Sequence, residues 1–339
     1  MVFAGKHVED LEGEDAGLGG DRQRPQHYIP EVRMGADTLG VLTDDNHVTP
    51  ARWHQPPRVR SVSFGSIRAS YVVDGSSKLA PATLFPDSGE DYWRERPEYL
   101  DSEGYLTLGA GGLLVEDGEH RVLIDTGMGP ILTEPSPDGA FGIIVGGDLL
   151  RSLATLGVHH SQLDTIAFTH LHTDHTGWLA TVIDPMSGES PLGHAQLVMT
   201  REEAEHGPHP FTGPSQEVID ALQPRLRLLA DGELVKPGVV LRLSPGHTVG
   251  HAIYEICSGG TTLIAFGDTF HSPAHVEHPE WTDALDLEHT QAVEARHRLL
   301  ERLAQPDTLG FGLHFADVAF GRISMAGSHS TWCPVITDW

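Results

Sequence analysis

Cysteine and cationic side chains are both scarce in this chain. Only two of the 339 residues are cysteines, Cys257 and Cys333, so no disulfide framework is indicated and we expect free thiols. Lys and Arg total 22 against 48 Asp and Glu, which gives a formal net charge of −26. Such an acidic surface repels polyanions, and this argues against nucleic acid and anionic membranes as partners. It leaves the charge of a substrate open, because bound divalent ions make a pocket locally positive.

Long apolar runs are also absent. The sequence has no stretch of about 18 apolar residues, which argues against a transmembrane helix, and its N-terminus carries no basic and then apolar leader. We therefore expect a cytoplasmic protein. Because 39% of its residues are hydrophobic, the chain is able to bury a substantial core in one large domain or two small ones.

Residues 1–57 differ in composition from the rest of the chain. They combine an acidic, glycine-containing run with several prolines, and they have little apolar surface to offset the entropy lost on ordering. We predict an N-terminal extension over 1–57 that is in part flexible and in part lies on the body. Alternatively, the extension is a dimer-forming arm or covers a pocket. A dimer-forming arm would make the protein a homodimer. The folded body is expected over 58–325, followed by a C-terminal tail over 326–339.

Apolar periodicity predicts a mixed α/β body. Strands are expected at 59–64, 67–73, 106–115, 120–124, 163–168, 195–199, 239–243, 261–265 and 309–313. Helices are expected at 149–156, 201–206, 215–230 and 287–304. Segments 78–105 and 128–147, rich in proline, glycine and acidic residues, are predicted to be loops, with Asp74–Gly75 as a turn and Asp286 as the N-cap of the last helix.

Three imidazoles and a carboxylate follow the expected strand 163–168 directly, at His170, His172, Asp174 and His175. Such groups are costly to bury unless they are paired or bound to metal, so a metal site explains them best. In extended backbone His170 and His172 point the same way and are able to hold one ion. Asp174 and His175 lie further round the turn, which suggests a second ion.

Further ligand candidates lie where other apolar runs end. A zinc-like ion takes about four N, O or S ligands, so two ions need more ligands than one motif supplies. The additional candidates each follow a strand-like run and are His247, Asp268 and His314. His251 follows His247 by four positions, and we interpret it as a supporting or core residue.

With these residues in this order, the chain resembles the metallo-β-lactamase fold superfamily of hydrolases, whose pattern is H-x-H-x-D-H followed by His, Asp and His. The resemblance covers residues 59–323 and implies an α/β fold, a four-layer αβ/βα sandwich. It also implies two divalent metal ions, with zinc expected and manganese, iron or cobalt as alternatives. Position by position, it implies that the first metal is held by His170, His172 and His247, and the second by Asp174, His175 and His314, with Asp268 bridging both.

The resemblance also implies how such a centre works. Two adjacent cations favour hydrolysis by a metal-bridging hydroxide, and Asp174 is the expected catalytic residue that orients it and transfers its proton. His271, three positions after Asp268, is the second catalytic candidate, either as a proton donor to the leaving alkoxide or as a hydrogen-bond donor to the substrate oxygen. Support of its own loop is the alternative role. Asp125, in an Asp-Thr-Gly turn, is expected to orient metal ligands.

We therefore predict a binuclear metal-dependent hydrolase that opens a lactone or a carboxylic ester of a small molecule. Lactonases of this fold often carry tyrosine at the position of His271, whereas relatives resembling methyl parathion hydrolase carry histidine, so phosphotriester hydrolysis is the alternative. A non-hydrolytic pathway enzyme on the same scaffold, which uses iron for sulfur oxidation or acts as a cyclase or an isomerase, is the other class. The branch of true β-lactamases with a cysteine where Asp268 stands fits less well, as does the flavodiiron branch, with glutamate where His172 stands.

Overall fold

The computed structural model describes residues 49–180, 190–208 and 212–335. The chain divides into two units, Met1–His47 and Val48–Trp339, and all of the described residues belong to the second unit. Most of the predicted N-terminal extension therefore lies outside the described residues, and its boundary at residue 57 stays a prediction. Among the described helices, none has both the length and the apolar character that a membrane span requires.

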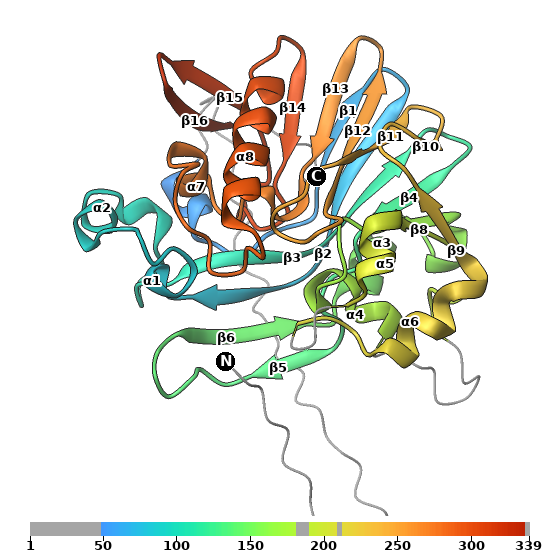
Figure 1. The fold of residues 1–339 in the computed structure, drawn as a ribbon, viewed down its shortest axis with the longest axis horizontal. Coiled ribbons are helices and arrows are strands. Elements are labelled where there is room, and N and C mark those ends of the chain that lie inside the picture. The colour runs from blue at the N-terminus through green and yellow to red at the C-terminus, as the bar shows by residue number, and fades with distance from the viewer. Residues whose placement is uncertain (1–48, 181–189, 209–211, 336–339) are drawn as a thin grey trace, which may run out of the picture. The chain divides into compact units, whose positions relative to one another are not determined.

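Two mixed sheets form the second unit (Figure 1). The first has the strand order β5-β6-β2-β3-β4-β7-β8-β9, with β1 paired to β2 off this path, and the second runs from β10 to β16 in sequence order. The first sheet comprises β1 (Arg60–Phe64), β2 (Ile67–Leu79), β3 (Leu106–Glu116), β4 (Arg121–Ile124), β5 (Ile131–Thr133), β6 (Phe141–Gly146), β7 (Thr165–Ala167), β8 (Gln196–Thr200) and β9 (Leu226–Leu229). The second comprises β10 (Leu234–Lys236), β11 (Val239–Leu243), β12 (Ala252–Ser258), β13 (Thr261–Ala265), β14 (Thr308–Phe311), β15 (Phe320–Ala326) and β16 (His329–Pro334).

Helices cover the outer faces of both sheets. One apolar cluster joins the first sheet to α3 (Leu149–Thr155), α4 (Thr173–Ala180) and α6 (Gln216–Leu222), and α5 (Arg201–His206) follows β8 directly. Another joins the second sheet to α7 (Pro273–Glu277) and α8 (His289–Leu303). Two short helices, α1 (Pro81–Leu84) and α2 (Glu90–Glu95), lie in the connection from β2 to β3. Figure 1 shows α8 lying along the second sheet, with α3, α4, α5 and α6 on the side of the first.

Side chains that alternate along each strand point either to the core between the sheets or to the helices outside. In β4, Val122 and Ile124 join the core between the sheets, whereas Leu123 points to the helices outside. In β13, Leu263 faces the same inner core and Ile264 faces the outer layer. The result is a helix–sheet–sheet–helix sandwich, which confirms the predicted αβ/βα architecture.

Both segments predicted to be loops contain secondary structure, so that prediction is wrong. Segment 78–105 begins with the end of β2 and carries α1 and α2, and segment 128–147 carries the hairpin of β5 and β6. The hairpin joins the sheet through pairing of Ser76 with Val145 and Ser77 with Ile144. Composition does not reveal this pairing, because the strands lie at a sheet edge and are interrupted by glycine.

The expected turn at Asp74–Gly75 is a bulge inside β2, and the strand continues to Leu79. The register against β3 shifts between Val73 and Gly75. Asp74 is buried here, and its carboxylate accepts hydrogen bonds from backbone amides of three other segments. The polar residue therefore connects these segments inside the protein and does not form a solvent-exposed turn.

Two further departures concern the second half of the chain. The helix predicted over 215–230 ends at Leu222, because Pro224 follows, and the chain continues as β9 in parallel pairing with β8. Strand β12 is absent from the sequence-based prediction. It is covered on both faces, with Ile253 outside and Tyr254 inside, so it lacks the polar alternation that marks a half-exposed strand.

Candidate metal centre

The predicted ligand residues come together at one edge of the sandwich, in loops from both sheets. The H-x-H-x-D-H motif follows β7, and its second half forms the first turn of α4. The remaining loops follow β11, β13 and β14 of the second sheet. In this way the folded chain gathers two groups of possible ligands, one made by His170, His172, His247 and Asp268 and the other by Asp174, His175 and His314.

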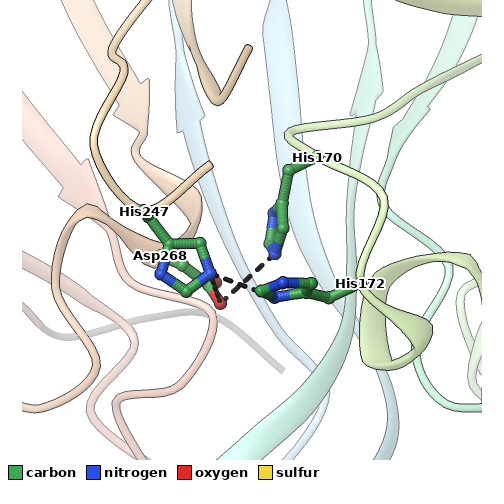
Figure 2. Close-up of side chains that lie close together, drawn as sticks. All are labelled: His170, His172, His247 and Asp268. Carbon is green, nitrogen blue, oxygen red and sulfur yellow. Dashed lines mark hydrogen bonds and ion pairs between the residues drawn. The ribbon is translucent and has the colours of Figure 1, made fainter. Parts of the chain in front are cut away.

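The first group surrounds one oxygen of Asp268 (Figure 2). Oδ2 of Asp268 lies 3.2 Å from Nε2 of His247 and 3.6 Å from Nε2 of His170. Nδ1 of His172 lies 3.1 Å from Nε2 of His247. All four side chains are buried, and their donor atoms point into a common space.

The second group surrounds the other oxygen of Asp268. Oδ1 lies 3.1 Å from Nε2 of His175 and 3.0 Å from Nε2 of His314. Oδ2 of Asp174 is 3.7 Å from Nε2 of His175 and 3.9 Å from that of His314. The side chain of Asp174 is 38% exposed, while that of His175 is fully buried, so the centre opens to solvent on the Asp174 side.

These spacings fit metal coordination. Ligands at about 2.0–2.2 Å from a tetrahedral zinc ion are roughly 3.3–3.6 Å from each other, and the contacts above, from 3.0 to 3.6 Å, lie within that range or slightly below it. Nε2 of His170 and Nε2 of His175 are buried without any hydrogen-bond partner in the described part of the chain. Buried imidazole nitrogens of this kind are costly unless an ion binds them, so the donor set suits a divalent metal on each side of Asp268.

Neighbouring polar groups fix the orientation of the imidazoles. Oδ2 of Asp125 lies 2.9 Å from Nδ1 of His175, and the carboxylate also accepts hydrogen bonds from the backbone and hydroxyl of Thr169. Nδ1 of His314 lies 2.7 Å from the carbonyl oxygen of Gly109. Asp125 has a left-handed backbone, with φ of 63°, which an aspartate adopts at a cost. Its position at the start of the predicted turn matches the role of orienting His175.

His251 supports the centre from behind. Its Nε2 accepts a hydrogen bond of 3.0 Å from the backbone N–H of Asp268, and its Nδ1 is 3.1 Å from the carbonyl oxygen of Ser244. Burial, with the charge of His247, lowers the pKa of His251 to about 3. A neutral His251 is the state that accepts from Asp268, in agreement with its predicted supporting position.

His271 lies against the carboxylate of Asp268. Its Nε2 is 3.0 Å from Oδ2 of Asp268, and its Nδ1 is 2.7 Å from Oδ2 of Asp283. His271, His275 and Asp283 together form a further cluster of possible ligands. The 2.7 Å spacing is shorter than that of two ligands on one ion, so we interpret His271 and Asp283 as a buried histidine–carboxylate ion pair.

Opposite charges shape the ionisation of the metal-free centre. Burial alone would raise the pKa of Asp268, but His175 and His314 hold it well below the usual value. Burial would lower the pKa of His175, yet Asp268 and Asp125 raise it well above the usual value. Burial lowers the pKa of His172 to about 3, so that imidazole is neutral and ready to donate to a metal. The centre thus carries an ionised carboxylate between imidazoles of different basicity.

One residue that sequence reasoning missed joins two of the ligand loops. Glu203, in the first turn of α5, is buried and accepts hydrogen bonds from Leu171 N at 2.9 Å, Thr248 Oγ1 at 2.7 Å and Gly250 N at 3.0 Å. Leu171 separates the first two motif histidines, and Thr248 follows His247. No sequence signal identifies Glu203, because a glutamate early in a polar helix looks like an ordinary solvated residue.

The prediction for Asp286 is wrong. Helix α8 begins at His289, its N-cap is Glu288, and Asp286 makes no capping bond. Its carboxylate turns inward instead, to Arg296 at 2.5 Å and to Nδ1 of His247 at 3.4 Å. A buried guanidinium and imidazole attract the carboxylate more strongly than the amides of an exposed helix end.

Comparison with known proteins gives the family of this arrangement. The model of the metallo-beta-lactamase superfamily matches residues 112–309, which run from β3 into β14 and include the motif, His247 and Asp268. The chain belongs to this superfamily. This assignment confirms the resemblance found in the sequence and agrees with the layered fold.

The sequences of individual superfamily members are only moderately similar to this chain. A probable metallo-hydrolase of Mycobacterium bovis is 29% identical over 177 residues, covering 47% of this chain and 56% of the relative. An N-acyl homoserine lactonase of a Bacillus species is 28% identical over 173 residues, covering 46% of this chain and 62% of the relative. The chain thus matches little more than half the length of these curated relatives.

Solved structures show the same fold over a longer range. The dizinc quorum-quenching lactonase AidC superposes with a TM-score of 0.70 at 22% identity, over 82% of this chain and 97% of that one. The hydrolase AbOPH gives a TM-score of 0.68 at 22% identity, over 84% of this chain and all of that one. At this identity the likeness establishes the fold of this superfamily member and leaves its substrate open.

Proposed function

We propose that this protein is a binuclear metal-dependent hydrolase that opens a lactone or a carboxylic ester of a small molecule. The observation that carries the proposal is the position of Asp268, whose two oxygens face two separate sets of ligands. Oδ2 faces His170 and His247, and Oδ1 faces His175 and His314. A carboxylate placed in this way suits a bridge between two ions, with zinc the first choice.

Two divalent ions, when bound, supply a water-derived nucleophile at neutral pH and polarise the oxygen of the scissile group. The chain's own residues orient the reactants and transfer the protons. Asp174 is the most exposed member of the two ligand groups, so we assign it to the open side, where it orients the attacking water and accepts its proton.

His271 lies on the other side of the bridging carboxylate. Its Nδ1 is held by Asp283, which leaves Nε2 to face Asp268 and the reacting group. We assign it to protonation of the leaving alkoxide or to a hydrogen bond with the substrate oxygen. Burial would lower the pKa of His271, but Asp283 and Asp268 raise it well above the usual value, so it carries the proton that either role requires.

Lactone opening is favoured by the relatives whose names state an activity. An N-acyl homoserine lactonase is among the curated matches, and AidC is described as a dizinc lactonase in complex with a product, N-hexanoyl-L-homoserine. Hydroxyacylglutathione hydrolases are also among the matches, and by name they too are hydrolases of an acyl compound. We therefore place lactones ahead of other esters as the substrate class.

The first test is metal content. Chelator-treated protein reloaded with zinc should contain about two ions per chain by mass spectrometry, and Asp268→Ala should lose both to a competing chelator. His297→Ala, which removes an exposed histidine of α8, is the matched control and should keep them. One ion or none in the wild-type protein would overturn the binuclear proposal.

The second test is an initial-rate panel on zinc-loaded protein, with acyl-homoserine lactones of several chain lengths, an aryl ester, a phosphotriester and a β-lactam. We expect lactone or ester turnover that falls about 10²-fold or more in Asp174→Asn, because proton transfer of this kind contributes about 10²–10⁴-fold. A comparable fall is expected for His271→Ala. A loss below about threefold would remove His271 from the chemistry, and turnover of the phosphotriester alone would replace the proposed substrate class.

A further inference from the structure

A buried ion pair lies directly behind His247. Oδ1 of Asp286 is 3.4 Å from Nδ1 of His247, and Oδ2 of the same carboxylate is 2.5 Å from a terminal nitrogen of Arg296. Nδ1 of His247 and Oδ1 of Asp286 are both buried, and neither makes a hydrogen bond in the described part of the chain. At 3.4 Å the two atoms face each other as an ion pair.

Arg296 is fixed by more than this pair. It is 1% exposed, its Nε donates to the carbonyl oxygen of Thr269 at 3.0 Å, and its Nη1 donates to that of Trp281 at 3.3 Å. Thr269 directly follows Asp268, so one guanidinium of α8 binds both the loop of the bridging carboxylate and the residue behind His247. A carboxylate held by a planar, rigid guanidinium has one orientation, which places Oδ1 toward the imidazole.

Backbone contacts hold the same two segments together. The N–H of Leu287 donates to the carbonyl oxygen of His247 at 3.1 Å, and that of Glu288 donates to Gly246 at 2.8 Å. A Cβ added to Gly246, whose φ is 138°, would lie 2.3 Å from the backbone nitrogen of Ala292 in α8. The His247 loop is thus seated against the start of α8, and Asp286 cannot move away from His247 without moving this loop.

Asp125 provides a parallel on the other side of the centre. It holds Nδ1 of His175 at 2.9 Å, in the same way that Asp286 faces Nδ1 of His247. His175 belongs to the second group of possible ligands and His247 to the first. Each group therefore contains one imidazole whose far nitrogen is turned to a buried carboxylate.

We propose that Asp286, held in place by Arg296, is a positioning residue for the first metal site. It accepts the Nδ1 proton of His247, which fixes the tautomer and leaves Nε2 free and aimed at the ion. This inference rests on the proposed binuclear site, and it predicts that Asp286 and Asp125 serve different ions. Asp286 does not touch the substrate, so it acts through His247 alone.

The test compares Asp286→Asn with Asp125→Asn, in protein stripped by chelator and titrated with zinc or cobalt. We expect Asp286→Asn to weaken one ion about 10- to 100-fold, the usual effect of losing such a partner, and to leave the other within about threefold. Its remaining cobalt absorption spectrum should match that of His172→Ala, which lacks a ligand of the first site. Asp125→Asn should match Asp174→Ala. Activity of Asp286→Asn should return at saturating zinc.

Loss of the carboxylate alone leaves the buried Arg296 without its counter-ion and threatens the fold. The double variant Asp286→Asn with Arg296→Gln removes both charges and keeps hydrogen-bonding ends, and it should show the same selective loss of one ion. The inference is overturned if the wild-type protein binds two ions and either variant keeps both with unchanged affinity, or loses them equally. A wild-type protein without two ions would overturn the proposed function, and the inference with it.

Discussion

Asp74 gives the sharpest prediction about stability, because one buried carboxylate is shared by four separate segments. Its side chain is 1% exposed. It accepts five hydrogen bonds: from Met128 N at 2.8 Å and Gly129 N at 2.9 Å on Oδ2, and from Gly147 N at 3.1 Å, Leu149 N at 3.0 Å and Trp178 Nε1 at 2.6 Å on Oδ1. Together these donors position the loop after β4, the end of the β5–β6 hairpin, α3 and the motif helix α4.

Asp74→Asn changes the shape of this side chain very little but replaces one acceptor oxygen with an amide donor. Whichever way the new amide is turned, at least two of the N–H groups face another donor. Each buried donor left without a partner costs about 1–3 kcal/mol, which gives roughly 2–6 kcal/mol. Burial raises the pKa of Asp74, because desolvation penalises its charged form. The neutral asparagine does not carry this penalty, so we expect the loss in unfolding free energy to lie in the lower part of the range, at about 2–4 kcal/mol.

The assay is equilibrium unfolding in denaturant at saturating zinc, for the wild-type protein, Asp74→Asn and a control variant. Asp138→Asn is the matched control, because Asp138 is exposed and its Oδ1 accepts from Ser136 Oγ at 2.6 Å and Ala140 N at 3.1 Å. That variant should stay within about 0.5 kcal/mol of the wild type. If Asp74→Asn lowers the free energy of unfolding by no more than the control does, the reasoning about shared buried donors is refuted.

Three further predictions follow from the same structure. Gly177→Ala places a Cβ 2.0 Å from the backbone of the loop after β4, so it should cost about 1–3 kcal/mol in thermal or denaturant unfolding, whereas Gly89→Ala, with open space around it, should cost little. Asp317→Ala leaves two largely buried arginines without their shared carboxylate and should lower the free energy of unfolding by about 3–5 kcal/mol; an unchanged unfolding midpoint would contradict this. Zinc uptake should release protons near pH 7, because the raised pKa values of His175 and His247 keep these imidazoles protonated until metal displaces the proton, so affinity should fall as the pH is lowered. Calorimetry in buffers of different ionisation heat measures this release, and heats that do not depend on the buffer would disprove it.

The grouping of the candidate ligands was predictable because each candidate is a histidine or aspartate at the end of an apolar run. His170, Asp268 and His314 stand directly after such runs, and loops at strand ends meet at one edge of a sandwich. The partners that orient the ligands were not predictable, apart from Asp125. Asp286 is separated from His247 by the β12–β13 hairpin, α7 and their loops, and Glu203 reaches its partners from a different sheet segment, so no local pattern reveals either contact.

The same distinction applies to the fold. Strands with one exposed face, such as β11, show alternation and are found in the sequence. Strands β4 and β13, although covered on both faces, are found as short apolar runs, whereas β12 and the edge hairpin of β5 and β6 depend on neighbours that no local pattern describes. The bulge at Asp74 is of this kind as well, since a polar residue beside glycine normally indicates a turn.

The distribution of ligands between the sheets has a consequence for the amount of protein in a cell. Each proposed ion takes side chains from the loop after β7 in one sheet and from the loops after β11, β13 or β14 in the other, so only the assembled sandwich offers a complete site. Metal that binds the folded state alone stabilises it by about 4 kcal/mol at a free concentration 1,000 times the dissociation constant. When metal is scarce, the folded population loses that contribution and more chains become exposed to proteases. Metal supply would then set both the number of active centres and the lifetime of the chains that carry them.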